Sequence, residues 1–206
     1  MVSHLLNVDT DLANTVAAEL RLEEMPSPAN AAQPTMNDLA SSPALSIVMN
    51  GPKSLKGRKI GLLVSDGVSM DLVKGLKAAV KAEGALLEVV APMVGGVNAD
   101  DGSLIEGDQK VDGGPSVLYD AVAVLLSAEG ASTLAKNPTA KDFVTDAFAH
   151  CKFVAYNEAA LTLFEKAGIA ADMDGGFIKI AKAGDAERFI DAARDLRFWS
   201  RETMLK

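Results

Sequence analysis

Few side chains in this sequence are of a type that performs covalent or metal chemistry. The 206 residues include one cysteine, Cys151, and two histidines, His4 and His150. A reactive thiolate needs exposure and a lowered pKa, whereas a lone cysteine is usually a small core residue, so Cys151 is kept only as a minor reactive-thiol candidate. A single cysteine excludes an intrachain disulfide, and two distant histidines argue against a zinc site, so we predict no metal.

The turns that follow predicted strands are the other places to look for a site, because open parallel sheets bind ligands at the carboxyl ends of their strands. The turn Ser65–Ser69 lacks GxGxxG spacing, and the chain has no GxxxxGK[ST] loop, so nucleotide binding is disfavoured. Asp71 falls in the first turn of the next helix, where the helix dipole favours a carboxylate with or without a function. Asn157 and Glu158 follow a later strand, where a nucleophile elbow would hold Ser or Cys. Because a carboxamide is a poor nucleophile, covalent acyl chemistry is disfavoured.

Two further segments contain residue types that bind ligands in other proteins. The run Asp172–Gly176 begins like a calcium loop but lacks the downstream spacing and terminal Glu of an EF-hand, which predicts a solvated loop. Trp199 is expected to anchor the C-terminal helix rather than to stack on nucleic acid.

Composition narrows the functional classes further. The chain has 20 Lys and Arg residues against 28 Asp and Glu residues, a formal net charge of −8, and no cationic block. Nucleic-acid binding needs clustered cations, so we expect no nucleic-acid partner. No apolar run approaches the roughly 20 residues of a membrane span, and the first residues do not resemble a signal peptide. These features predict no membrane association and a cytoplasmic location.

The first quarter of the chain differs from the rest. Residues 1–22 are predicted to form one helix from Ser3 to Leu22, with Ser3 as a plausible N-cap. The apolar stripe on this helix consists of Leu5, Val8, Leu12, Val16 and Leu20. Such a stripe must dock on a partner, which is either the rest of this chain or another domain. Residues 23–54 are rich in Pro and predict an extended linker, with 44–49 able to pack on a neighbour.

From residue 55 to residue 206 short apolar runs alternate with amphipathic segments. The predicted strands are 60–64, 86–91, 120–126 and 153–156, with a fifth at the edge, 177–180. The predicted helices are 70–84, 141–150, 159–166 and 185–198, and 97–111 reads as an inserted hairpin. This alternation predicts an α/β domain with a flavodoxin-like, doubly wound, mostly parallel sheet.

The order of short motifs resembles the C-terminal part of large-subunit monofunctional haem catalases. The matching stretches are Val2–Asp9, Ser42–Ser46, Asn50–Pro52, Lys56–Lys59, Val90–Pro92, Val94–Val97, Asp112–Ser116, Asp120–Val124, Phe148–Phe153 and Leu196–Trp199. The resemblance runs nearly end to end, and its order and spacing are more specific than any one motif. It implies the last helix of the catalase body, a linker, and a domain similar to the intracellular-protease and class I glutamine-amidotransferase superfamily.

That resemblance also says which residues to compare with known sites. It implies that the parent tetramer decomposes hydrogen peroxide with haem held in the larger body, so that this chain is one piece of a longer protein. Neither Tyr119 nor Tyr156 has the Arg four residues earlier that the family's haem tyrosinate has, so we expect no haem or other cofactor here. In the wider superfamily, Asp71 corresponds to the acidic site residue and Asn157 to the nucleophilic Cys.

Three hypotheses follow from these observations. The first is a non-catalytic structural domain that stabilises the catalase body and contacts neighbouring subunits of the tetramer. The second is a chaperone-like module that binds unfolded client proteins. The third is a vestigial hydrolase or amidotransferase-like site at Asp71, Asn157 and Glu158, or at Cys151. Alone, the chain is expected to be a monomer or a dimer.

Overall fold

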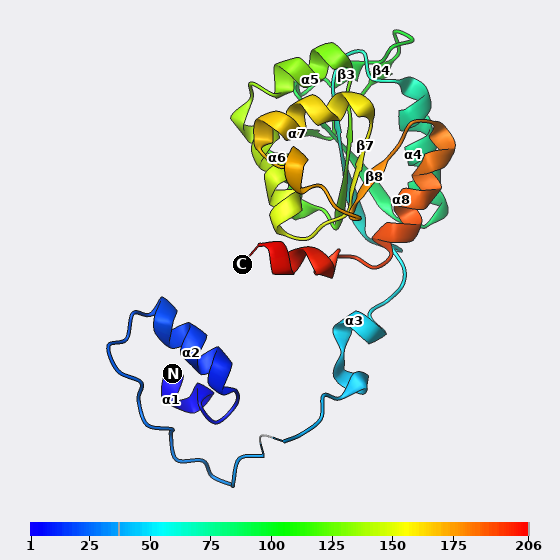
Figure 1. Ribbon diagram of the computed structural model, residues 1–206. Coiled ribbons are helices and arrows are strands. Elements are labelled where there is room, and N and C mark those ends of the chain that lie inside the picture. Colours follow the sequence, from blue (N-terminus) through cyan, green and yellow to red (C-terminus); the bar gives the residue numbers. More distant parts are fainter. Residues whose placement is uncertain (37, 206) are drawn as a thin grey trace. The chain divides into compact units, whose positions relative to one another are not determined.

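The computed structural model describes residues 1–36 and 38–205 (Figure 1). Asn37 of the predicted linker and Lys206 of the predicted domain lie outside the described residues. The chain divides into two units, Met1–Asn50 and Gly51–Lys206, and each is described by itself. No helix in the described part is both long enough and apolar enough to span a bilayer.

The first unit contains two helices where the sequence predicted one. Helix α1 covers Val2–Leu5 and α2 covers Thr10–Glu19, so the prediction of one helix from Ser3 to Leu22 is wrong. The interruption occurs at Asp9, whose extended backbone and Oδ1, 2.8 Å from the Leu12 nitrogen, start a new helix. Ser3 is not an N-cap; Met1 holds that position.

The apolar stripe predicted for this segment is only partly buried: Leu5 and Val16 pack against the buried cluster. The buried residues of α1 and α2 are Val2, Ala13 and Ala17, while Val8, Leu12 and Leu20 are exposed. The predicted linker also contains a 3-10 turn, η1 (Pro43–Leu45), and a short helix, α3 (Ile47–Asn50). It is therefore not extended throughout.

The second unit is built on a six-stranded sheet in which every neighbouring pair is parallel. Its strands are β1 (Lys59–Val64), β2 (Leu86–Ala91), β5 (Gln109–Lys110), β6 (Ala121–Leu125), β7 (Val154–Tyr156) and β8 (Phe177–Lys179). Their order is β5-β2-β1-β6-β7-β8, and β1 forms the register Ile60↔Leu87 on one side and Ile60↔Ala121 on the other. The central strands are continuous apolar runs because helices cover both faces, which confirms the predicted fold class.

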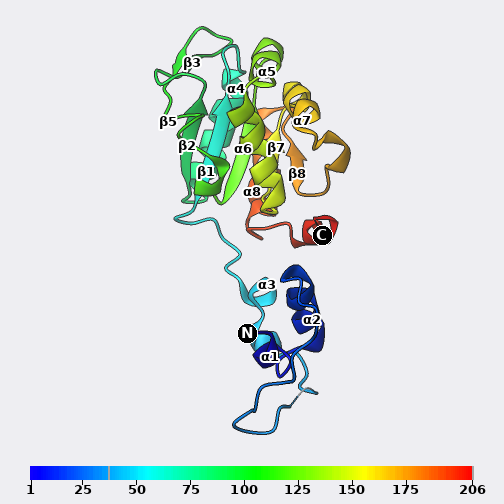
Figure 2. The ribbon, with the colours of Figure 1, turned by 90° about the vertical axis from the view of Figure 1, so that its left-hand side faces the viewer.

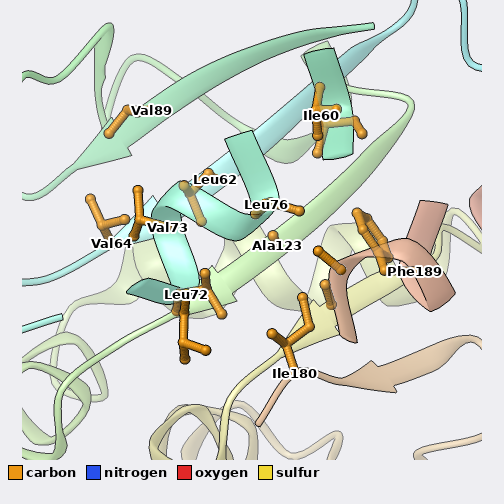
Figure 3. Close-up of a cluster of buried hydrophobic side chains, with 14 of the residues drawn as sticks. Ile60, Leu62, Val64, Leu72, Val73, Leu76, Val89, Ala123, Ile180 and Phe189 are labelled. Atoms are coloured by element: carbon orange, nitrogen blue, oxygen red, sulfur yellow. The ribbon is translucent and has the colours of Figure 1, made fainter. Parts of the chain in front are cut away.

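The helices form two layers around this sheet (Figures 1 and 2). Helices α4 (Met70–Ala82) and α8 (Ala186–Ala193) cover one face; α5 (Ala128–Leu134), α6 (Pro138–Ala149) and α7 (Leu161–Ala167) cover the other. Figure 3 shows the first of the two resulting cores, where Leu72, Val73 and Leu76 of α4 pack over Leu62 and Ala123. This layering places the turns after β1, β6 and β7 at one edge of the sheet.

Several connections differ from the prediction. The inserted hairpin is limited to β3 (Val97–Asn98) and β4 (Leu104–Ile105), because β5 joins the main sheet beside β2. Helix α5 was missed, and α8 ends at Ala193 rather than at Phe198 because Leu196 adopts a φ of 66°. Short 3-10 turns complete the chain: η2 (Ser116–Leu118), η3 (Glu158–Ala160), η4 (Ala170–Asp172), η5 (Ala183–Asp185) and η6 (Trp199–Met204).

Candidate functional site

The carboxyl edge of the sheet is occupied by hydrogen bonds that hold the turns together. Asn157, directly after β7, accepts a bond from the Leu126 N–H at Oδ1 (3.1 Å) and donates one from Nδ2 to the Leu126 carbonyl (2.7 Å). The carboxamide thus pairs with the backbone after β6 as a further strand residue would. Both polar groups of the Asn157 side chain are therefore used for structure.

The neighbouring turns are joined in the same way. Buried Ser65, after β1, accepts a hydrogen bond at Oγ from the Ser127 N–H (3.0 Å). The Ser127 hydroxyl donates to the Asp66 carbonyl and accepts from the Gly130 N–H (3.0 Å), which caps α5. These two serines tie the ends of β1 and β6 to each other and to the start of α5.

The carboxylates predicted for the site lie outside this network. Asp71 is exposed in the first turn of α4, where the Met70 N–H bonds to Asp100 Oδ1 (2.9 Å). Glu158 is exposed and forms an ion pair with Lys179. Asp71 and Asn157 follow β1 and β7, and β6 separates those strands, so the two residues are not adjacent in the sheet.

Cys151 lies at the other end of β7 from Asn157. It is buried with a φ of 54°, and its carbonyl accepts a hydrogen bond from the Phe198 N–H (2.7 Å). A thiol in this position is part of the packing beneath the C-terminal segment. Within residues 1–36 and 38–205, no group of three or more His, Cys, Asp or Glu side chains could hold a metal ion.

Replacing Asn157 by Ala tests whether this side chain is structural. We expect the free energy of unfolding to fall by about 1–3 kcal/mol, because the Leu126 N–H and C=O lose their partners at a half-buried position. Urea denaturation followed by circular dichroism measures the change. Glu158→Gln, which alters only the exposed pair with Lys179, is the matched control and should change stability little. Equal effects of the two substitutions would contradict the structural role.

Two buried cations at the amino edge of the sheet were missed by the sequence analysis. The Lys152 ammonium, just before β7, donates to the carbonyls of Ser116 and Tyr119, the latter at 2.7 Å. Burial lowers the pKa of Lys152 to about 8, and the Arg197 charge adds to this, while Asp120 and Asp146 oppose it. Lys152 therefore joins η2 to the start of β7 inside the protein.

The second buried cation is Arg201 in η6. Its Nε and Nη2 each lie 2.8 Å from one carboxylate oxygen of Asp174, and Nη1 donates to the Lys152 carbonyl at 2.9 Å. The guanidinium also lies 4.8 Å from the centre of the Phe148 ring and 5.1 Å from that of Phe177. This arrangement fixes the C-terminal segment to three other parts of the unit.

These contacts correct two predictions. The run Asp172–Gly176 is not simply a solvated loop, because Asp174 pairs with Arg201. Burial alone would raise the pKa of Asp174. The Arg201 guanidinium and the Gly176 N–H hold that pKa below its usual value. Trp199 is not the anchor of the C-terminal segment, because its side chain is 46% exposed. Phe198 and Arg201 have that role, with the Phe198 ring against Phe153.

The fold is similar to that of a known solved structure. Oxidized DJ-1 from Toxoplasma gondii matches with a TM-score of 0.58 over 72% of this chain and 96% of that chain, at 14% sequence identity. At this identity the similarity concerns the fold alone.

Sequence comparisons are more specific. The chain is 50% identical over 206 residues to "Catalase C" of Rhizobium meliloti (strain 1021). The match covers 100% of this chain and 29% of that protein. It is 34% identical over 218 residues to "Catalase HPII" of Mycobacterium avium, covering 98% of this chain and 30% of that protein. It therefore spans less than a third of the length of these curated relatives. A family model described as the C-terminal domain found in long catalases matches residues 56–203, well over half of the sequence, so the chain belongs to that family.

Proposed function

We propose that this chain is the non-catalytic, structural C-terminal domain of a larger cytoplasmic catalase, and that it stabilises the catalase body and the tetramer. One observation carries the proposal: Asn157 stands where the superfamily resemblance places a nucleophile, and its side chain is committed to the Leu126 backbone. Asp71 is exposed and follows a strand that β6 separates from β7, and Cys151 is buried at the opposite end of β7. The Asn157 carboxamide thus supports a structural rather than a catalytic role for this edge of the sheet.

The residues of this chain do not fit haem. Tyr119 is buried with its ring over Gly61, where even a Cβ atom would lie 2.3 Å from the ring. Tyr156 packs against the rings of Phe164 and Phe177. Both rings thus take part in the packing of residues 51–206. We therefore assign haem and peroxide decomposition to the rest of the larger protein.

The first unit supplies candidate contacts with that larger protein. Its large exposed apolar residues are Met1, Val8, Leu12, Leu20, Leu22, Met25, Met36, Leu39, Leu45, Ile47, Val48 and Met49. Large apolar side chains left exposed in such number are typical of segments that a partner covers. The relatives have more than two thirds of their length outside the matched segment, which provides such a partner.

Deleting this chain from the catalase that carries it tests the proposal. We expect the truncated enzyme to keep its Soret band when freshly prepared, to lose activity at a lower temperature, and to dissociate from the tetramer at a lower urea concentration. Light scattering and residual oxygen evolution measure both effects. Unchanged tetramer stability would refute the proposal, as would a Soret band from the isolated chain supplied with haem.

A second candidate function, binding of unfolded proteins, rests on the same exposed side chains of the first unit. The isolated chain then suppresses thermal aggregation of a client protein at stoichiometric amounts. Residues 51–206 alone are the matched comparison, because they lack those side chains. Absence of suppression by the full chain ends this alternative.

A further inference from the structure

One of the three outward-facing positions of β2 lacks a backbone partner among the described residues. The Leu86 N–H bonds to the Arg58 carbonyl at 2.8 Å, so residues 86, 88 and 90 face β1, and alternation turns 87, 89 and 91 outward. Strand β5 pairs with Val90 and Ala91 only. Val89 is bonded to Asp108 through both its N–H (2.7 Å) and its C=O (2.9 Å). Leu87, by contrast, has no outward backbone partner among the described residues.

A cavity of about 410 Å³ lies beside this open edge. Its lining comes from Met70 and Lys77 of α4, Leu87 and Val89 of β2, Leu104 and Ile105 of β4, and the following Glu106 and Asp108. The lining mixes apolar side chains with charged ones, and Leu104 is 58% exposed. An unpaired backbone position next to a cavity that has apolar side chains in its lining suits an extended peptide that contributes both hydrogen bonds and a side chain.

The charges that line the cavity indicate the charge of a peptide that would bind there. Glu106 and Asp108 outnumber Lys77, and the whole chain has a net charge of −8. Asp108 already bonds to the backbone of Val89, but its charge remains at the rim. Basic residues on either side of the inserted side chain therefore complement this surface.

We propose that an extended basic peptide segment pairs with the outer edge of β2 at Leu87 and inserts an aliphatic side chain into the cavity between α4, β2 and β4. The N–H and C=O of Leu87 bond to the peptide backbone, as a further strand would. Bonds of this kind carry affinity, and the cavity with its acidic rim carries specificity. This surface lies within residues 51–206 and does not depend on the stabilising role proposed above.

The probe is a blocked heptapeptide, acetyl-Lys-Val-Lys-Leu-Lys-Val-Lys-amide, added to the full chain labelled with ¹⁵N. We expect the amide hydrogen of Leu87 to exchange with solvent about tenfold more slowly at saturation, because it becomes hydrogen-bonded. The same peptide methylated at alternate backbone nitrogens keeps its charge and side chains but cannot pair as a strand, so it should bind at least about tenfold more weakly. Equal binding of the methylated peptide would overturn the proposal.

Two matched variants locate the side-chain contact. Leu104→Lys places a charge at the rim of the cavity, whereas Leu86→Lys places the same charge on an exposed side chain on the opposite face of β2. We expect Leu104→Lys to weaken binding about tenfold more than Leu86→Lys does. Equal affinities of the two variants, or unchanged exchange at Leu87 with the wild-type chain, would refute this site. If an analogue of the peptide with Glu in place of every Lys bound with equal affinity, the proposed preference for basic peptides would be refuted.

Discussion

Arg201→Ala is expected to lower the free energy of unfolding of residues 51–206 by about 3–5 kcal/mol, because it leaves the Asp174 carboxylate without its bidentate partner. The substitution also removes the bond to the Lys152 carbonyl and the contacts with two aromatic rings. In a unit of this size such a loss corresponds to a fall in melting temperature of about 10 °C. Differential scanning calorimetry of the full chain measures it.

The control for this prediction lies two residues away. Trp199→Ala removes a larger side chain from the same 3-10 turn, but that side chain is nearly half exposed and should contribute much less to stability. Arg201→Lys keeps the charge without the fork that spans both Asp174 oxygens, so an intermediate loss is expected. If Trp199→Ala proved more destabilising than Arg201→Ala, the anchor would have been assigned to the wrong side chain.

Local pattern was sufficient to predict the strands of the main sheet except β5, which was read as part of the inserted hairpin. The runs at 60–64 and 86–91 were located within one residue of β1 and β2, because short runs rich in aliphatic residues are typical of strands in a parallel sheet. Helix α5 was missed because Gly130, Ser132 and Thr133 give it low helix propensity; it forms because Ser127 caps it and Ala131 and Leu134 are buried. Tertiary packing outweighs propensity there.

Prediction of the first helix failed for a different reason. The apolar spacing from Leu5 to Leu20 was read as one continuous stripe, but Asp9 is a strong N-cap that begins a second helix inside it. The strong preference of Asp for N-cap positions was the signal available in the sequence.

The sequence could predict part of the candidate site but not all of it. The position of Asn157 after a strand could be predicted, because chain order places it at the carboxyl edge. Its bonds to Leu126 could not, because they depend on how β6 and β7 align. Lys152 and Arg201 were missed since cations are expected at the surface. The available signal for Lys152 was its place inside the apolar run from Cys151 to Ala155.

Lys152→Met has the other large expected effect, and its size should depend on pH. Near pH 7 the variant loses the donors to the Ser116 and Tyr119 carbonyls, which are left buried and unpaired, at a cost of about 1–3 kcal/mol each. The loss is partly offset because the wild-type protein must bury a charged ammonium. We expect a net destabilisation in urea denaturation at pH 7, compared with Lys166→Met, which alters an exposed lysine on α7.

Raising the pH should enlarge the difference between wild type and Lys152→Met. The pKa of Lys152 is about 8 in the folded chain, below its usual value of 10.5, so between these values the unfolded chain binds more protons than the folded one. The wild-type free energy of unfolding therefore gains a contribution from Lys152 that grows as the pH rises from about 8 toward 10.5, and the variant lacks it. A neutral amine still donates two hydrogen bonds, so both carbonyls remain paired. We expect the wild-type advantage to increase by about 1–3 kcal/mol over this interval. A difference that stays constant or shrinks would mean that Lys152 is not held in the fold with a lowered pKa.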